Sequence, residues 1–153
     1  MNLLKSQLYQ HCLDYVDDLI NNAEKGLAQA QHDANQEEKS SAGDKFETHR
    51  AMMHLQMESF IKRLSVAEAQ QRTLYTLSLT HKYKVSLGAL VETDRGHYFI
   101  GISAPPLTVE GVVYTFLSPQ APLYKALDGK REGDWAEWML RGEETLSEII
   151  NVI

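Results

Sequence analysis

The sequence has one cysteine, Cys12, among 153 residues, and only four prolines. A single cysteine excludes an internal disulfide and a cysteine-based zinc cluster, and it is typical of proteins in a reducing compartment. None of the prolines falls in the first 76 residues, so this half can form long uninterrupted helices.

Basic residues are also few, with 15 Lys and Arg against 21 Asp and Glu and a formal charge of -6. Dividing the chain near residue 76 gives 8 basic and 11 acidic residues before it, and 7 and 10 after it. Neither half has the basic surplus that binding to phosphates requires. Any role with nucleic acid is therefore expected to work through another protein.

Long apolar runs are missing as well, since no stretch approaches the roughly 18 residues of a membrane span. The start, residues 1–5, is not followed by the apolar segment of a signal peptide. We expect a cytoplasmic protein with no membrane partner.

Motifs of self-contained enzymes are absent too. There is no glycine-rich phosphate loop and no nucleophile-elbow sequence. His49 and His54 are five residues apart, which is not the i, i+4 spacing of two metal ligands on one helical face. We expect a protein that is not a free-standing enzyme and has no intrinsic cofactor.

A heptad pattern is the first feature that is present. Apolar or aromatic residues alternate at spacings of four and three, with mostly polar residues between them, as an amphipathic helix requires. The series is Tyr9, Leu13, Val16, Ile20, Ala23, Leu27, Ala30 and Ala34.

A second heptad series follows Gly43, and six of its seven members are apolar: Met53, Met57, Phe60, Leu64, Ala67, Gln71 and Leu74. Two helices of similar length joined by a short polar segment favour an antiparallel coiled-coil hairpin over residues 1–76, with its tip near 36–47. A parallel dimer of one continuous helix competes with this interpretation, but Ser40, Ser41 and Gly43 disfavour it. The oligomeric state stays open.

The second half, residues 77–153, changes to short extended runs rich in Val, Leu, Ile, Tyr and Phe. We expect consecutive antiparallel strands over 84–93, 96–103 and 112–117, and a final hairpin of 135–140 and 145–152 around residues 141–144. Pro122 to Leu127 predicts a short helix, with proline in its first turn and Gly129 past its end. Together with the hairpin this predicts an α+β fold whose second domain is small and β-rich.

Aromatic residues are expected to supply much of the core of that domain: Tyr98, Phe99, Phe116, Trp135 and Trp138. The two tryptophans are three residues apart, so they cannot point to the same face of a regular strand. We therefore expect one of them to be exposed or to lie against the base of the coiled coil.

Residues 117–134 carry a Ser-Pro, Leu-x-x-x-Leu-x-Gly-Lys, Gly-Asp pattern, which resembles the signature of the Gre transcript-cleavage factors (GreA/GreB). The resemblance implies an FKBP-like C-terminal domain that docks on bacterial RNA polymerase at its secondary channel, while the coiled coil enters the channel. Its motif residues would be the partner-binding residues: Ser118, Pro119, Leu123, Gly129 and Lys130.

The tip sequence Gly43-Asp44-x-x-Glu47 is similar to the acidic tip of the same family. The resemblance implies that Asp44 and Glu47 help to hold the second Mg²⁺ of the polymerase active centre and so stimulate hydrolysis of backtracked RNA. The hydrolysis would belong to the polymerase, and RNA would be contacted only through it. Carboxylates are the ligands that this hard cation prefers.

Two other interpretations stay open. Asp44 and Glu47 also match a capping box at the start of the second helix. The residues after the tip are Thr48, His49, Arg50 and Ala51, whereas Gre proteins usually continue with Asn-Ala-Glu-Tyr. This difference favours a Gre-like regulator that occupies the channel without cleavage. A prolyl isomerase or chaperone module is a third possibility that fold analogy alone suggests.

Overall fold

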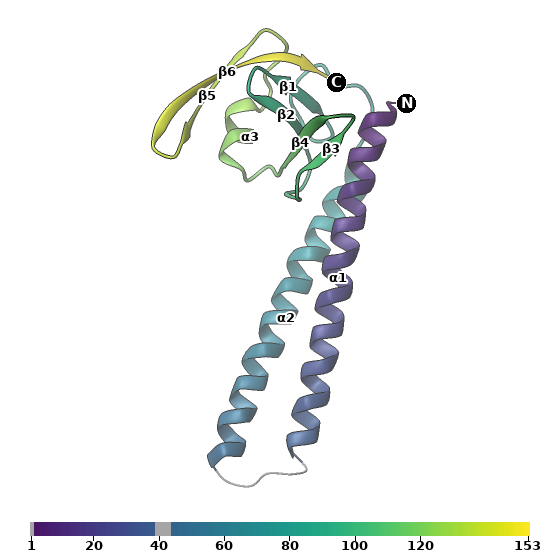
Figure 1. The fold of residues 1–153 in the computed structure, drawn as a ribbon, viewed down its shortest axis with the longest axis vertical. Helices are drawn as coiled ribbons and strands as arrows, with labels where there is room; N and C mark the ends of the chain where they lie inside the picture. The colour runs from purple at the N-terminus through teal and green to yellow at the C-terminus, as the bar shows by residue number, and fades with distance from the viewer. Residues whose placement is uncertain (1, 39–43) are drawn as a thin grey trace. The chain divides into compact units, whose positions relative to one another are not determined.

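The computed structural model describes residues 2–38 and 44–153, and the side chains of 37–46 lie outside the description (Figure 1). The described chain forms two compact units. One is Asp14–Arg72, and the other combines residues 2–13 with Thr73–Ile153. A helical hairpin precedes a six-stranded sheet, which confirms the predicted α+β class.

Two long helices make up the first half of the chain. Helix α1 spans Leu3–Glu38 and α2 spans Asp44–Thr76. At about 1.5 Å per residue, each is roughly 50 Å long. Neither contains proline, and their polar faces carry the charged residues that the heptad pattern left outside the seam.

The predicted seam is buried or half-buried at every position within Asp14–Arg72. Val16, Ala23, Ala30 and Ala67 are buried. Gly26 lies against Phe60, because a Cβ atom added at Gly26 would be 2.3 Å from the Phe60 ring. The glycine thus makes room for the largest side chain of the second series.

The first turns of α1 depart from the predicted seam. Leu8 and Cys12 are fully buried, whereas the predicted Tyr9 and Leu13 are only half-buried. Residues 2–13 of α1 belong to the unit that contains the sheet. The heptad pattern considers only the packing of two helices, so it does not determine which face of these residues is buried.

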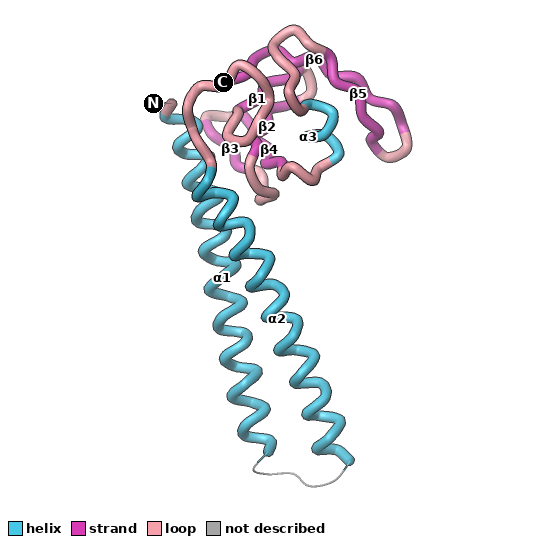
Figure 2. The backbone as a smooth tube through the Cα atoms, turned by 180° about the vertical axis from the view of Figure 1, so that it is seen from behind, coloured by secondary structure: helices cyan, strands magenta, loops and turns pink. Residues whose placement is uncertain are grey.

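Six strands form the sheet of the second unit, in the order β3-β4-β2-β1-β6-β5 (Figure 2). Their bounds are Leu90–Thr93 (β1), Gly96–Ile100 (β2), Leu107–Val109 (β3), Val112–Leu117 (β4), Trp135–Leu140 (β5) and Glu143–Val152 (β6). Helix α3 spans Pro122–Leu127, as predicted.

The expectation of consecutive antiparallel strands was wrong for one pair. Strands β2 and β4 are parallel, with Phe99 opposite Phe116. A parallel pair needs a crossover, and the unpredicted strand β3 belongs to it. The chain passes Pro105 and Pro106 to reach the edge strand β3 and then turns back into β4, which pairs with β3 antiparallel.

Two hairpins turn on two residues each, with positive φ at both. Glu110 and Gly111 connect β3 to β4, with φ of 50° and 81°, and Arg141 and Gly142 connect β5 to β6, with φ of 52° and 82°. Positive φ at both central residues is what a type I′ turn requires. The predicted four-residue turn over 141–144 is therefore shorter, and β6 begins at Glu143.

A bulge interrupts the pairing of β1 with β6. Glu92 lies opposite Asn151 and Thr93 opposite Ile149, so Ile150 has no partner of its own. Ile149 and Val152 are both buried although they are three residues apart. The extra residue shifts the alternation by one and so returns Val152 to the core.

The core of the sheet unit contains small and branched side chains from β1, β2, α3, β5, β6 and the 85–89 segment: Val85, Ala89, Val91, Ile100, Leu127, Ala136, Ile149 and Val152. Phe99 and Phe116 are also buried, as predicted. Of the two tryptophans, Trp135 is 55% exposed and Trp138 half-buried, in agreement with the expectation that one of them is exposed. Trp135 alternates with the buried Ala136 along β5, which places it on the solvent side of the strand.

The strand predicted from residue 84 begins only at Leu90. Val85 pairs instead with the segment after α3, since its N–H donates to the Lys130 carbonyl at 2.8 Å. Gly88 then turns the chain with φ of 84°, and a Cβ atom there would be 2.1 Å from the Ser78 carbonyl oxygen.

Candidate functional site

The predicted acidic tip is described only in part. Residues 39–43, which include Ser40, Ser41 and Gly43, lie outside the described residues, as does the side chain of Asp44. Asp44 is the first residue of α2, and Glu47 lies in its first turn with an exposed side chain. Residues three apart on a helix share a face, so the α2 backbone places the two acids on the same side.

This geometry is compatible with both interpretations of the tip. Asp44 starts the helix, which is the position of an N-cap or of a neighbouring first-turn residue. The Glu47 side chain is exposed to solvent, so it can bind a cation that is held by another molecule. Among the described residues, no group of three or more His, Cys, Asp or Glu side chains could hold a metal ion by itself.

A hollow of about 320 Å³ lies between the helices near this end. Its lining includes Ala34 of α1 and four residues of α2: Arg50, Met53, His54 and Met57. The alanine of the first series is too small to fill the space opposite two methionines.

The Ser-Pro residues of the signature follow β4 directly. The Ser118 carbonyl accepts a hydrogen bond from the Ala121 N–H at 3.0 Å, which turns the chain into α3. Ser118 and Pro119 are half-buried. Pro122 occupies the first turn of α3, where a missing N–H costs nothing.

The rest of the signature has a clear structural role. Leu123 packs against the core of the sheet unit. Gly129 has φ of 73° and donates its N–H to the Val85 carbonyl at 2.9 Å. The Lys130 carbonyl accepts from Val85, and its side chain is half-buried.

Gly133 and Asp134 complete this pattern. Gly133 has φ of 89° and donates its N–H to the Ile149 carbonyl at 2.8 Å, while the Asp134 carboxylate accepts from the Arg131 N–H at 2.8 Å. Much of the signature therefore specifies how the chain passes from β4 through α3 to β5.

Lys5 is a feature that the sequence pattern did not reveal. Its side chain is 1% exposed, and its Nζ donates to the carbonyls of Thr80 at 3.0 Å and Ile153 at 3.1 Å. Burial, with a smaller contribution from the charge of Lys82, lowers the Lys5 pKa to about 8. The lysine ties the start of α1 to two distant segments of the same unit.

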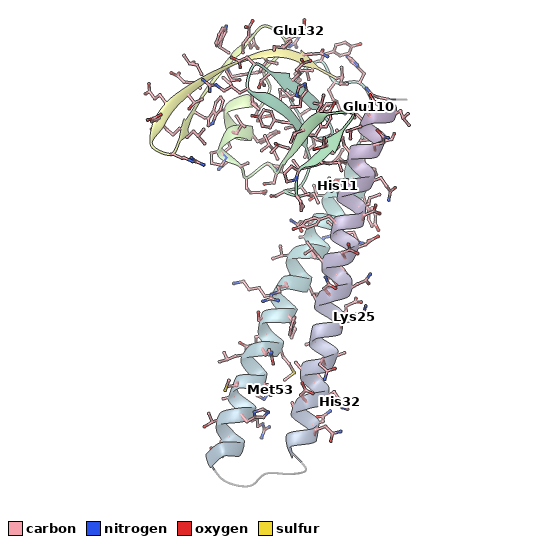
Figure 3. All side chains as sticks on the ribbon, in the orientation of Figure 1. His11, Lys25, His32, Met53, Glu110 and Glu132 are labelled. Carbon is pink, nitrogen blue, oxygen red and sulfur yellow. The ribbon has the colours of Figure 1, made fainter. Side chains whose placement is uncertain are left out.

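His11 makes a second such contact. Its Nε2 lies 2.8 Å from the Pro105 carbonyl, and its ring is 5.0 Å from that of Phe116. Figure 3 places His11 on the side of α1 toward β3 and β4. Lys5 and His11 could be found only from the tertiary structure, because their partners are 75 or more residues away.

Comparison with known proteins gives a limited result. No family model matches the sequence, and no curated protein matches it significantly. Among the solved structures that match, we report three that align with most of the chain. All three are of Gfh1.

The first, described as the transcription factor Gfh1, is 15% identical, with 90% of this chain and 92% of that chain aligned and a TM-score of 0.38. GreA factor homolog 1 (Gfh1) of Thermus thermophilus is 16% identical over 95% of this chain and 94% of that chain, with a TM-score of 0.36. Thermus aquaticus Gfh1 is 15% identical over 94% of each chain, with a TM-score of 0.37. At these values, the alignment with Gfh1 carries no information about individual residues.

Over the described residues, no helix is both long and apolar enough to cross a membrane.

Proposed function

We propose that this chain is a Gre-like transcription elongation factor that binds bacterial RNA polymerase through its secondary channel and stimulates cleavage of backtracked RNA. The observation that supports it most is the long two-helix hairpin, in which α2 begins at Asp44 and exposes Glu47 in its first turn. The C-terminal signature, residues 117–134, adds to it by resemblance.

The proposed mechanism needs only carboxylates from this chain. Asp44 and Glu47 would help to hold a second Mg²⁺ in the polymerase active centre, and the ion when bound would supply an activated water for hydrolysis. The polymerase supplies the RNA contacts, so the net charge of -6 does not oppose the reaction. The chain itself is then an activator and not an enzyme.

Stalled, backtracked polymerase complexes provide the test. Wild-type protein is expected to accelerate release of short 3′ RNA, and the double variant Asp44→Ala, Glu47→Ala is expected to lose this effect. Glu58→Ala is the matched control, since Glu58 is exposed on α2 but lies outside the tip. Equal cleavage by wild type and double variant would refute the proposed role of the tip acids.

A Gre-like regulator that occupies the channel without stimulating cleavage is the second candidate. The residues after the tip favour it, because Thr48-His49-Arg50-Ala51 stands where Gre proteins usually have Asn-Ala-Glu-Tyr. Stable binding to polymerase with unchanged cleavage would establish this alternative, and absence of binding would reject both.

A further inference from the structure

The β5–β6 hairpin has one buried and one open face. Opposite residues in an antiparallel pair share a face, and the register pairs Trp135 with Glu148, Glu137 with Leu146, and Met139 with Glu144. The alternating residues Ala136, Ser147 and Ile149 are buried. We call the open side the outer face, made of Trp135, Glu137, Met139, Glu144, Leu146, Glu148 and Ile150.

Four large apolar side chains lie open on this outer face. Trp135 is 55% exposed, Met139 58%, Leu146 50% and Ile150 44%. Ile150 is the bulge residue between the buried Ile149 and the exposed Asn151, which leaves it on the solvent side. The solvent side of an antiparallel hairpin is usually polar, and contiguous exposed apolar groups mark interaction surfaces.

Three carboxylates alternate with these apolar groups. Each of Glu137, Glu144 and Glu148 lies opposite one of them across the strands. Within the described part of the chain, none of the three forms an ion pair. Two arginines border the hairpin: Arg95, whose Nε donates to the Leu146 carbonyl at 2.8 Å, and Arg141 in the β5–β6 turn. The outer face is therefore both apolar and acidic.

The negative charge of the three glutamates restricts which molecule can bind to the outer face. A second copy placed face to face would bring two sets of three glutamates together, which is unfavourable. A partner that carries Lys or Arg beside its apolar residues would neutralise them. Trp135 and Met139 are four residues apart on β5, or about 13 Å, which is close to the roughly 11 Å of two helical turns. One amphipathic helix therefore fits along the hairpin.

The outer face is also separate from the signature residues. Helix α3 packs on the buried side, where Leu123, Tyr124 and Ala126 meet the core cluster that contains Ala136 and Ile149. Figures 1 and 2 both show the end of the hairpin extending beyond α3. A partner on the outer face would leave Ser118 and Pro119 free for another contact.

We propose that the outer face of the β5–β6 hairpin docks a cationic amphipathic helix of RNA polymerase, as a contact distinct from the one implied for residues 118–130. This proposal rests on the proposed function, because it takes the polymerase as the partner. The apolar side chains supply the binding energy, and the glutamates favour a helix that carries Lys or Arg beside its apolar residues.

Site-specific photocrosslinking to purified core polymerase tests it. A benzophenone amino acid is placed at position 139, and at position 113 as a control, since Val113 is 54% exposed on β4, away from the hairpin. We expect crosslinks from position 139 alone, to a helical polymerase segment that contains Lys or Arg, and fewer of them at high salt. Met139→Glu is expected to weaken binding about tenfold or more, and Val113→Glu less than about twofold.

The outcomes separate the two proposals. If the complex forms but position 139 crosslinks to nothing, to a second copy or to a segment without basic residues, the docking proposal is wrong and polymerase binding stands. A Met139→Glu variant that keeps the wild-type circular dichroism spectrum and full affinity would also overturn it. If the unmodified protein does not co-elute with polymerase, both proposals fail.

Discussion

At the scale of single residues, the buried side chain of Lys5 links folding to pH. Its ammonium is buried, and its hydrogen-bond partners are the main-chain oxygens of Thr80 and Ile153. Burial penalises a charge that is not paired. The folded state therefore holds the proton of Lys5 less tightly than the unfolded chain does.

This leads to a prediction about alkaline pH. The folded pKa of Lys5 is about 8 and the ordinary value is 10.5, so between these values the unfolded chain binds more protons than the folded one. The free energy of unfolding of wild type, relative to Lys5→Met, is expected to rise with pH in this window, by up to about 1.4 kcal/mol per pH unit. Urea unfolding at several pH values between 7 and 10.5 measures it.

Lys25→Met is the control for this prediction, because Lys25 is exposed on α1. Its unfolding free energy should differ from that of wild type by the same amount at every pH. A Lys5→Met variant whose difference from wild type is equally flat would show that the Lys5 pKa is not lowered by folding.

Asp94 shows how a second residue joins distant segments. Its carboxylate accepts hydrogen bonds from the Ser147 hydroxyl and from the Glu148 N–H. The Ser147 bond is the main cause of the lowered pKa of Asp94. The β1–β2 turn is thereby attached to β6 beside the bulge, where regular pairing is interrupted.

At the scale of elements, the contact between Gly26 and Phe60 makes the helical hairpin specific. Alanine is the better helix former by about 1 kcal/mol, yet its Cβ atom at position 26 would collide with the Phe60 ring. We expect Gly26→Ala to lower the free energy of unfolding by about 1–3 kcal/mol in spite of its higher helix propensity.

A double-mutant cycle tests this contact. The variant Gly26→Ala, Phe60→Leu should recover most of the stability lost by Gly26→Ala, since the smaller side chain leaves room for the new methyl group. The readout is urea unfolding followed by circular dichroism. Additive effects of the two substitutions would mean that Gly26 and Phe60 are not coupled.

The helices could be predicted because their signal is local and repeated. The seven positions of the second series, from Met53 to Leu74, are all buried or half-buried in the structure. At the start of the first series, Leu8 and Cys12 are fully buried and the predicted Tyr9 and Leu13 only half-buried, since this part of α1 also contacts segments outside α2, as the contacts of Lys5 and His11 show.

The sheet was harder to predict, because its order depends on pairings between distant segments. Strand β3 has three residues, and its turn at Glu110 and Gly111 lacks the usual Asn-Gly or Asp-Gly sequence. Without β3, the parallel pairing of β2 with β4 could not be foreseen. Strand β5 and helix α3 had the predicted bounds, since turn or helix-end residues border each of them.

The candidate tip was identified by its position between two heptad series, and Asp44 does start α2. Sequence reasoning did not find the outer face of the β5–β6 hairpin. It depends on which residues of β5 and β6 lie opposite each other, and the bulge at Ile150 shifts that alternation within β6.

At the scale of the whole molecule, the charge of -6 restricts the partners. The proposed function predicts that the protein binds core polymerase in the absence of nucleic acid, and that it does not retard free RNA or DNA in a gel-shift assay at the same concentration. An acidic chain with no basic surplus in either half of its sequence repels phosphates, so its affinity must come from protein contacts. Retardation of free RNA, with no binding to core polymerase, would contradict this prediction.

The strand order of the sheet also determines when the sheet unit can fold during synthesis. Strand β6 lies between β1 and β5. The N–H and carbonyl of Leu90 both hydrogen-bond to Ile153, and the Ile153 main-chain oxygen also accepts a hydrogen bond from Lys5 Nζ. On the ribosome, α1, β1 and β2 are made long before this partner exists. Lys5 and Leu90 can form these hydrogen bonds only after residue 153 has left the ribosome. The sheet unit can therefore fold completely only after β6 has been synthesised.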